Sequence, residues 1–363
     1  MQKQINLMCP INNLGYGIAS VNILKKLYQK CHVSLSLIGE NIQVETQEDA
    51  NIVSECIQRE RHINFDAPCI KIFHQNQMGT FAGKGMRIGF PFFELDEFSP
   101  IEKHHLNSLD KLFVASDWAK NVCLNNNLKI SEENIHVVPL GVDNDLFVMP
   151  TVDLPRESNN TIFFNCGKWE VRKGHDILPE IFNRAFSEED NVELWMMCDS
   201  PFMSIEENEQ WRNLYRSTKL GSKIKFIDRV KSHSEVYNIM TQVDCGIFPS
   251  RAEGWNLELL EMMSCGKQVI ATNYSGHTQF CSDESCALIE IEEKEVAYDG
   301  VWFSGNYGKW MKITENNKQA IVDSMLKVHE SKQNNGLEIN YNGIITANSL
   351  SWDNTAQEII KYV

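Results

Sequence analysis

Two glutamates, Glu253 and Glu261, bracket the segment EGWNLELLE, which follows a strand-like run ending in Phe-Pro-Ser. The second glutamate lies a little over two helical turns beyond the first, so both carboxylates can face the same side of the chain. Gly254 allows a ligand to approach the backbone closely, and the start of a helix favours an anion. The spacing fits one carboxylate that binds hydroxyls near the helix start and another that binds a more distant polyol, such as a ribose. It fits equally well a helix with an N-terminal acid and a solvated glutamate.

Closely spaced cations lie upstream, in the segment NCGKWEVRKG that begins at Asn165. This segment follows the strand-like run TIFF and precedes a helix. A strand, a glycine and then Lys168 and Lys173 suit the binding of a diphosphate. Arg172 is a candidate to substitute for the cation at position 168, but we expect its side chain to be solvated.

Residues 253–261 resemble the EGxxLxxLE signature of retaining GT-B glycosyltransferases of family GT4, known as glycosyl transferases group 1. The resemblance implies that Glu253 contacts the donor sugar and that Glu261 contacts the nucleotide ribose. The backbone around Trp255, Asn256 and Leu257 would cradle the diphosphate together with Gly254. Residues 167–174 resemble the family element G-R-x(4)-K-G, in which Lys173 matches the lysine. Lys168 replaces the arginine, and a lysine supplies charge without the bidentate fork.

Other positions are assigned by the same resemblance. Arg229 lies in a segment that resembles the frame of the nucleotide base. Gly15 and Gly17 lie in the loop after the first strand, where the family places a donor-contacting glycine; such loops also simply make tight turns. His74 ends a strand and is predicted to contact the donor sugar, so we group it with Glu253 and Lys173 as catalytic. Glu94 is a candidate contact of the acceptor, whereas we expect His277 to be a surface histidine.

Two α/β domains are expected to position these residues. Six strand-like runs fall in residues 5–139 and six more in 161–291, with helical stretches between most of them, which indicates parallel sheets. We assign 1–150 to a Rossmann-like acceptor-side domain and 155–345 to a Rossmann-like donor domain, joined by a linker over 143–160. The C-terminal helix 351–363 is expected to pack back on the first domain. Residues 292–313 are predicted to form an irregular loop. The resemblance implies that the two sheets face each other across a deep cleft.

Composition excludes several classes of protein. The formal net charge is −15, and acidic residues outnumber basic ones in both halves, so bulk charge does not indicate a nucleic-acid binder. In the first half of the chain, the candidates for a local basic groove are Lys25, Lys26, Lys30, Lys84 and Arg87. Eleven cysteines occur without a CxxC pair, which is typical of reduced thiols in a cytoplasmic protein. No apolar run reaches the length of a membrane helix, and we identify no DxD-type aspartate pair in a strand-end position that would indicate a metal site.

The resemblance predicts a reaction as well as a fold. A sugar would move from a nucleoside-diphosphate sugar, with UDP favoured, to a hydroxyl of a glycan or glycolipid precursor, without an essential cofactor or metal. Two kinds of alternative stay open. One is a phage-type transferase that modifies hydroxymethylated cytosine in DNA. The other is a sugar-nucleotide epimerase or a non-catalytic nucleotide-sugar-binding protein.

Overall fold

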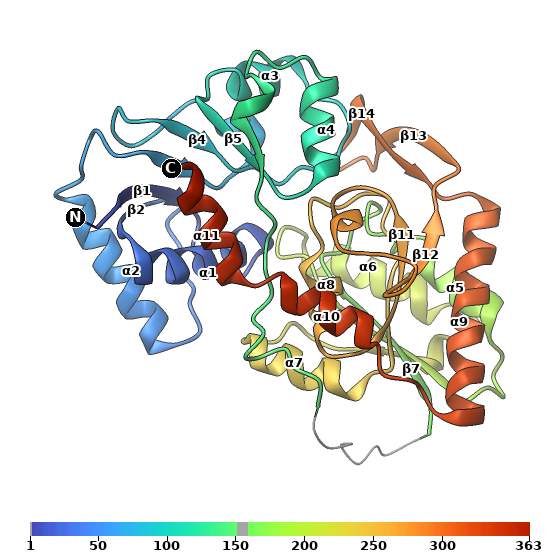
Figure 1. Ribbon diagram of the computed structural model, residues 1–363. Helices are drawn as coiled ribbons and strands as arrows, with labels where there is room; N and C mark the ends of the chain where they lie inside the picture. Colours follow the sequence, from blue (N-terminus) through green and yellow to red (C-terminus); the bar gives the residue numbers. More distant parts are fainter. Residues whose placement is uncertain (1, 151–158) are drawn as a thin grey trace. The chain divides into compact units, whose positions relative to one another are not determined.

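The computed structural model describes residues 2–150 and 159–363, and contacts divide the chain into two units. Unit 1 is Met1–Gly141 with Leu350–Val363, and unit 2 is Val142–Ser349 (Figure 1). Within the described ranges each unit is built on one six-stranded parallel sheet, as the two sets of strand-like runs predict.

The sheet of unit 1 has the strand order β2-β1-β3-β4-β5-β6. Its elements in chain order are β1 (Gln4–Cys9), α1 (Gly15–Lys30), β2 (His32–Leu37), α2 (Gln47–Glu60), β3 (Cys69–Lys71), η1 (Gln75–Gln77), β4 (Arg87–Gly89), α3 (Pro100–Leu106), β5 (Lys111–Val114), α4 (Asp117–Asn125), η2 (Glu132–Asn134), β6 (Ile135–Val137) and α11 (Trp352–Tyr362). Leu7 of β1 pairs with Leu35 on one side and Ile70 on the other, and all three are fully buried. Such continuous burial is typical of parallel strands covered on both faces.

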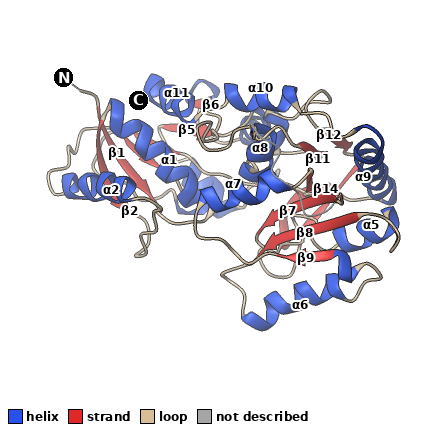
Figure 2. Ribbon diagram, turned by 90° about the horizontal axis from the view of Figure 1, so that it is seen from below, coloured by secondary structure: helices blue, strands red, loops and turns tan. Residues whose placement is uncertain are grey.

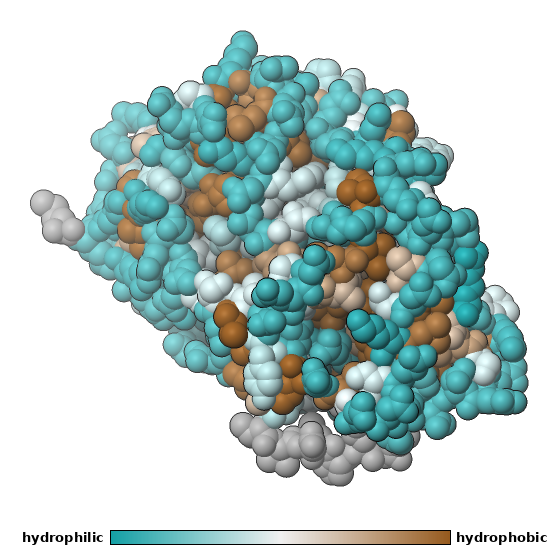
Figure 3. All heavy atoms as spheres, turned by 45° about the vertical axis from the view of Figure 1, so that its right-hand side comes forward, coloured by the Kyte–Doolittle hydropathy of each residue, from teal (hydrophilic) through white to brown (hydrophobic). Residues whose placement is uncertain are grey.

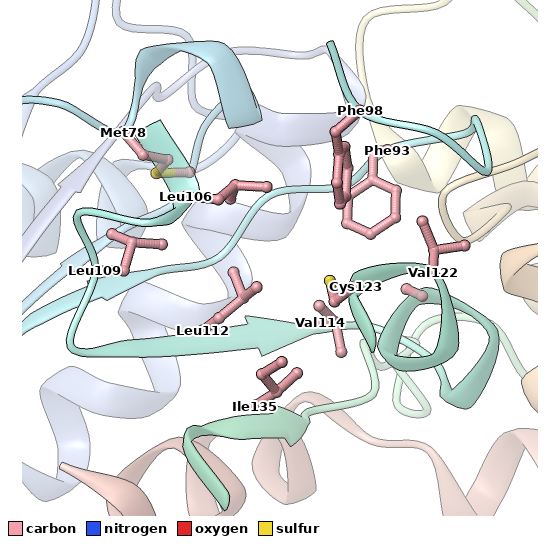
Figure 4. Packing of buried hydrophobic residues seen from close by; sticks show 11 residues of the cluster. Met78, Phe93, Phe98, Leu106, Leu109, Leu112, Val114, Val122, Cys123 and Ile135 are labelled. Atoms are coloured by element: carbon pink, nitrogen blue, oxygen red, sulfur yellow. The ribbon is translucent and has the colours of Figure 1, made fainter. Parts of the chain in front are cut away.

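One hydrophobic cluster fixes α4 and the loops before α3 to this sheet. Leu112 and Val114 of β5 meet Val122 and Cys123 of α4, with Phe93 on the same cluster (Figure 4). The Phe93 and Phe98 rings pack edge to face, with centroids 4.8 Å apart. The segment that contains Glu94 is thereby anchored by buried aromatic neighbours.

The sheet of unit 2 has the strand order β12-β11-β10-β7-β8-β9. The elements of unit 2 in chain order are β7 (Thr161–Gly167), α5 (Leu178–Ala185), β8 (Val192–Cys198), α6 (Ile205–Arg216), η3 (Gly221–Lys223), β9 (Ile224–Phe226), α7 (His233–Gln242), β10 (Cys245–Phe248), α8 (Leu257–Ser264), β11 (Gln268–Asn273), η4 (Gly276–Gln279), β12 (Ala287–Glu290), β13 (Glu293–Tyr298), β14 (Ser304–Lys312), α9 (Glu315–Asn335) and α10 (Tyr341–Ser349). In Figure 2 strands β7, β8 and β9 lie side by side with α6 beyond β9. The order places β7 next to β10, so their carboxyl ends, where ligands bind in open α/β sheets, are neighbours.

Two expectations about the chain need correction. Unit 1 ends at Gly141 rather than 150, because Phe147 packs against His233 and Tyr237 and its carbonyl accepts a hydrogen bond from Ser264, all in unit 2. Residues 292–313 are not an irregular loop, because β13 and β14 form an antiparallel hairpin. Part of the expected linker, residues 151–158, lies outside the described residues.

The C-terminal helix α11 belongs to unit 1. Asp353 forms an ion pair with Lys26 of α1 at 2.7 Å, and Lys3 donates to the carbonyl of Ile360 at 2.8 Å. The Tyr362 ring stacks on His136 at 3.8 Å between centroids. A side chain at Gly141 would lie 2.3 Å from the backbone of Ser351, so only glycine permits the close return of the chain.

The surface is predominantly hydrophilic on the face seen in Figure 3, with hydrophobic residues in separate small patches. None of the helices in the described parts of the chain has the length and apolar character that a membrane crossing requires. All eleven cysteines lie in these parts and are free thiols.

Candidate functional site

The predicted donor residues of unit 2 gather where β7 and β10 end. Lys168, Arg172 and Lys173 lie in the loop after β7, and Glu253 lies between β10 and α8. Gly167 has φ of 135°, and the side chain of Lys173 passes so close that a Cβ at Gly167 would lie 3.1 Å from its Cε. The glycine therefore lets the Lys173 side chain fold back over the end of β7, which Lys168 follows directly in the chain.

Five side chains here form a chain of alternating charges. Lys168 Nζ lies 2.8 Å from Glu170 Oε1, and Arg172 Nη2 lies 2.7 Å from Glu170 Oε2. Arg172 Nη1 lies 2.7 Å from Glu253 Oε2, and Lys173 Nζ lies 3.0 Å from Glu253 Oε1. Among the described residues this network has three cations and two carboxylates, so its net charge is positive. Both ends are the lysines predicted to bind the diphosphate.

Burial makes this network strongly coupled. Burial by itself would raise the pKa of Glu253, but the charges of Arg172 and Lys173 outweigh it and hold that pKa well below its ordinary value. Burial would lower the pKa of Lys173, but Glu253 and Glu258 outweigh it and raise that pKa. Glu253 and Lys173 are therefore charged at neutral pH, and a buried charge is tolerated because its partners are hydrogen-bonded.

Glu253 is held from several sides. Its carboxylate also accepts a hydrogen bond from Ser250 Oγ at 2.8 Å. Its backbone N–H donates to Ser275 Oγ, and its carbonyl accepts from the N–H of Gly276 at 2.9 Å. A Cβ at Gly276 would lie 2.2 Å from the Gly254 carbonyl oxygen, so this close packing of two loops requires glycine at 276.

Helix α8 begins at the same place. Asn256 adopts φ of 82° and its side chain accepts from the N–H of Leu259, which caps the helix. Trp255 Nε1 and Asn256 Nδ2 are buried and have no hydrogen-bond partner among the residues the structure describes. Two unpaired donors beside a helix N-terminus suit the oxygens of an anionic ligand. Glu261 is buried within α8.

Some expectations for unit 2 are wrong. Arg172 is not solvated: it is buried and also donates to the Ala252 carbonyl at 2.6 Å. His277 is not a surface residue: it is fully buried, and its Nε2 lies 2.5 Å from the Thr272 carbonyl oxygen. Spacing alone could not reveal the direction of either side chain, because Arg172 lies in a loop and His277 in the single turn of η4, and neither has a periodic pattern that fixes a buried face. Arg229 is exposed in the loop between β9 and α7.

Unit 1 brings its own candidates together around Tyr16. The Tyr16 ring lies 4.8 Å from that of His74 and stacks on Phe92 at 4.8 Å, while its hydroxyl donates to the Phe92 carbonyl. Burial, and to a lesser degree the charge of Glu94, raise the pKa of Tyr16 well above its ordinary value. His74 is exposed and Glu94 is half-buried.

Tyr16 itself was missed in the sequence, although it stands between the two predicted glycines. Gly15 begins α1 with open space around it, whereas a Cβ at Gly17 would lie 2.1 Å from the Asn12 carbonyl oxygen. Gly15 is thus free for a ligand, and Gly17 is required by the turn. An aromatic residue between two loop glycines was the available signal.

Comparison with known structures identifies the fold. The chain superposes on sucrose-phosphate synthase of Thermosynechococcus elongatus with a TM-score of 0.71 and 14% identity, covering 99% of this chain and 98% of that one. It matches HepE of Anabaena, solved with UDP and glucose, with the same TM-score and identity and 99% of each chain. The two parallel α/β sheets are therefore those of a GT-B glycosyltransferase fold, as predicted.

Sequence comparison finds a family match within unit 2. Residues 160–299 match the family described as glycosyl transferases group 1, which is the family that the motifs resemble. The O-antigen biosynthesis glycosyltransferase WclY of Escherichia coli is 29% identical over 92 residues, a quarter of either chain. One subunit of the phosphatidylinositol N-acetylglucosaminyltransferase from Arabidopsis thaliana is 22% identical over 222 residues, 58% of this chain and 47% of that one. The chain thus spans at most about half the length of these curated relatives.

Proposed function

We propose that this chain transfers a sugar from a nucleoside-diphosphate sugar, with UDP as the favoured nucleotide, to a hydroxyl of a glycan or glycolipid precursor. The observation that carries the proposal is the buried ion network of unit 2, which has a net positive charge and ends in Lys168 and Lys173. The network lies beside the α8 N-terminus, where Trp255 and Asn256 keep unpaired donors. All these groups favour a ligand with more than one negative charge.

The chemistry of the leaving group explains why such a site would catalyse transfer. When the sugar bond breaks, negative charge develops on the diphosphate, and fixed cations and N–H donors stabilise it. Lys173 and Lys168 supply charge, and the backbone of residues 254–257 supplies dipoles. We propose that no metal or other cofactor is required, because these groups can stabilise the diphosphate without one. Retention of configuration is the stereochemical outcome that we propose.

The carboxylates have separate proposed roles. Glu253, kept ionised by Arg172 and Lys173, would bind donor-sugar hydroxyls, and Glu261 would bind the ribose. Exposed Arg229 would lie near the base. The roles of Gly15, Gly17 and His74 toward the donor, and of Glu94 toward the acceptor, stay predictions that rest on the family resemblance.

The relatives support a nucleotide-sugar donor and a glycan or lipid acceptor. Structures of HepE are complexes with UDP and with UDP-glucose. WclY is named for O-antigen biosynthesis, and the plant relative is named for transfer of N-acetylglucosamine to phosphatidylinositol. We take the substrate class, not the particular sugar or acceptor, from these names.

Modified DNA is the less favoured acceptor. Lys25 pairs with Asp49 at 2.8 Å, and Lys26 and Lys30 both lie near Asp353, at 2.7 and 3.5 Å. The lysines that a basic groove would need in α1 are therefore neutralised by neighbouring carboxylates.

A donor and acceptor screen tests the proposal. Thermal shift would be measured with UDP-, GDP-, ADP- and dTDP-sugars, followed by nucleotide release with glycan, lipid-linked glycan or hydroxymethylated DNA. Stabilisation by one nucleotide with acceptor-dependent release supports transfer. Conversion of the sugar without an acceptor would indicate an epimerase, and binding without any turnover would indicate a binding protein. Absence of stabilisation by every nucleotide would overturn the proposal.

A further inference from the structure

Two exposed aromatic rings face the lysine that departs from the family motif. The ammonium of Lys168 lies 5.4 Å from the centroid of the Phe202 ring and 5.7 Å from that of Trp302. The two rings pack edge to face, with centroids 5.6 Å apart. Phe202 is 56% exposed and Trp302 is 48% exposed. The two rings therefore form an exposed aromatic pair beside Lys168.

The rings come from segments far apart in the sequence. Phe202 lies in the loop between β8 and α6, whereas Trp302 lies in the turn of the β13–β14 hairpin. On the remaining side the Lys168 ammonium meets the carboxylate of Glu170, which is buried. Two ring faces and one carboxylate thus surround a lysine whose side chain would otherwise be free to rotate.

The hairpin turn that presents Trp302 is firmly built. Asp299 Oδ1 accepts hydrogen bonds from the N–H groups of residues 301, 302 and 303, at 2.8 to 2.9 Å. Phe303 packs against buried Trp310, whose Nε1 donates to Glu295 at 3.0 Å. The N–H of Met311 donates to the carbonyl of Arg251. The hairpin is therefore fixed to the loop that holds Glu253.

We propose that Phe202 and Trp302 are positioning residues of the donor site, which hold the Lys168 ammonium where it meets the donor diphosphate. An arginine at this position would bind phosphate through a rigid fork, whereas a lysine needs its surroundings to fix its direction. The two rings supply that direction by cation–π attraction. This inference rests on the proposed function and assigns a role to a hairpin that the family motifs do not include.

The test is calorimetric binding of UDP and of UMP to the full chain and its variants. Phe202→Ala and Trp302→Ala should each weaken UDP binding about 2- to 5-fold, the range expected for a cation–π contact at an exposed site. UMP should be affected less, because it carries fewer phosphate charges for Lys168 to meet. Trp302→Phe should keep most of the affinity, since it keeps an aromatic face. Tyr307→Ala is the matched control: it removes an exposed aromatic ring of the same hairpin, outside the pair that faces Lys168.

A double-mutant cycle with Lys168→Met separates positioning from direct contact. If the rings act through the lysine, adding Trp302→Ala to Lys168→Met should cause no further loss of UDP affinity. A full additional loss, or equal losses for UDP and UMP, would show that the ring contacts the nucleoside and would overturn the inference. Unchanged UDP affinity in both single variants would also overturn it, while leaving the proposed function intact. Failure of the wild-type chain to bind any nucleotide would overturn both.

Discussion

Replacing Arg172 by methionine should destabilise unit 2 strongly, because this side chain joins two buried carboxylates. Its guanidinium contacts Glu170 through Nε and Nη2 and contacts Glu253 through Nη1, all within 2.9 Å. Methionine fills much of the volume but donates no hydrogen bond. Removing one partner from a buried ion pair typically costs about 3–5 kcal/mol. For a domain of this size that corresponds to a fall in Tm of roughly 6–20 °C.

The assay is thermal unfolding of the full chain at two pH values. In the wild type, burial acts to raise the pKa of Glu253. The charges of Arg172 and Lys173 more than offset this effect, so the pKa of Glu253 is lowered. Stability from this carboxylate is therefore present above the unfolded pKa of about 4.3 and is lost as the pH falls toward the folded pKa. In the variant, the charge of Arg172 no longer offsets the effect of burial, so the pKa of Glu253 rises. The Tm deficit should therefore be larger at pH 8 than at pH 3, which lies below the unfolded pKa.

Arg184→Met is the matched control. Arg184 also lies between two carboxylates, Glu180 and Glu315, but its side chain is 39% exposed. Water screens these contacts, so we expect a much smaller change than for Arg172. The reasoning from the buried network would be refuted if both variants showed the same fall in Tm. It would also be refuted if the fall in Tm of Arg172→Met were independent of pH.

Three further predictions concern donor binding and acid stability. Lys173→Met should reduce nucleotide release about 100-fold, the loss typical of removing one group that stabilises developing charge, and full turnover would contradict the diphosphate role. Glu261→Ala should weaken UDP binding by about 10-fold but should leave binding of 2′,3′-dideoxy-UDP unchanged, whereas an equal loss for both ligands in calorimetry would refute a ribose contact. Burial lowers the pKa of His175 to about 3. The unfolding free energy should therefore fall as the pH drops below about 6.5, by up to about 1.4 kcal/mol per pH unit, and a denaturation series in which His175→Gln keeps the wild-type slope would contradict this.

The sequence was most informative about the parallel strands. β7 is buried at all but its last residue, so its run of apolar residues stands out between polar turns. The β13–β14 hairpin gave a weaker signal, because most of β13 is exposed and Gly300, Gly305 and Gly308 interrupt the pattern with positive φ. Glycines in such positions suit a hairpin turn and bulge, but in one sequence they also suit an irregular loop.

The candidate site shows a different limit. Motif spacing located Lys173 and Glu253 but could not show that Arg172 lies between Glu170 and Glu253. That arrangement depends on β7 and β10 being neighbours in the sheet, which is a property of the fold and not of either loop. The aromatic pair at Lys168 likewise joins segments separated by about a hundred residues in the chain.

The return of α11 to unit 1 affects how the chain can acquire its structure during synthesis. Unit 1 lacks α11 until all of unit 2 has left the ribosome, because Val142–Ser349 lie between its two segments. The contacts of Lys26, His136 and Gly141 with this helix must wait for that moment. Unit 2, by contrast, is continuous in sequence and can fold as it emerges. The natural order of translation therefore allows the unit with the ion network to form first, and leaves the amino-terminal unit to be completed last.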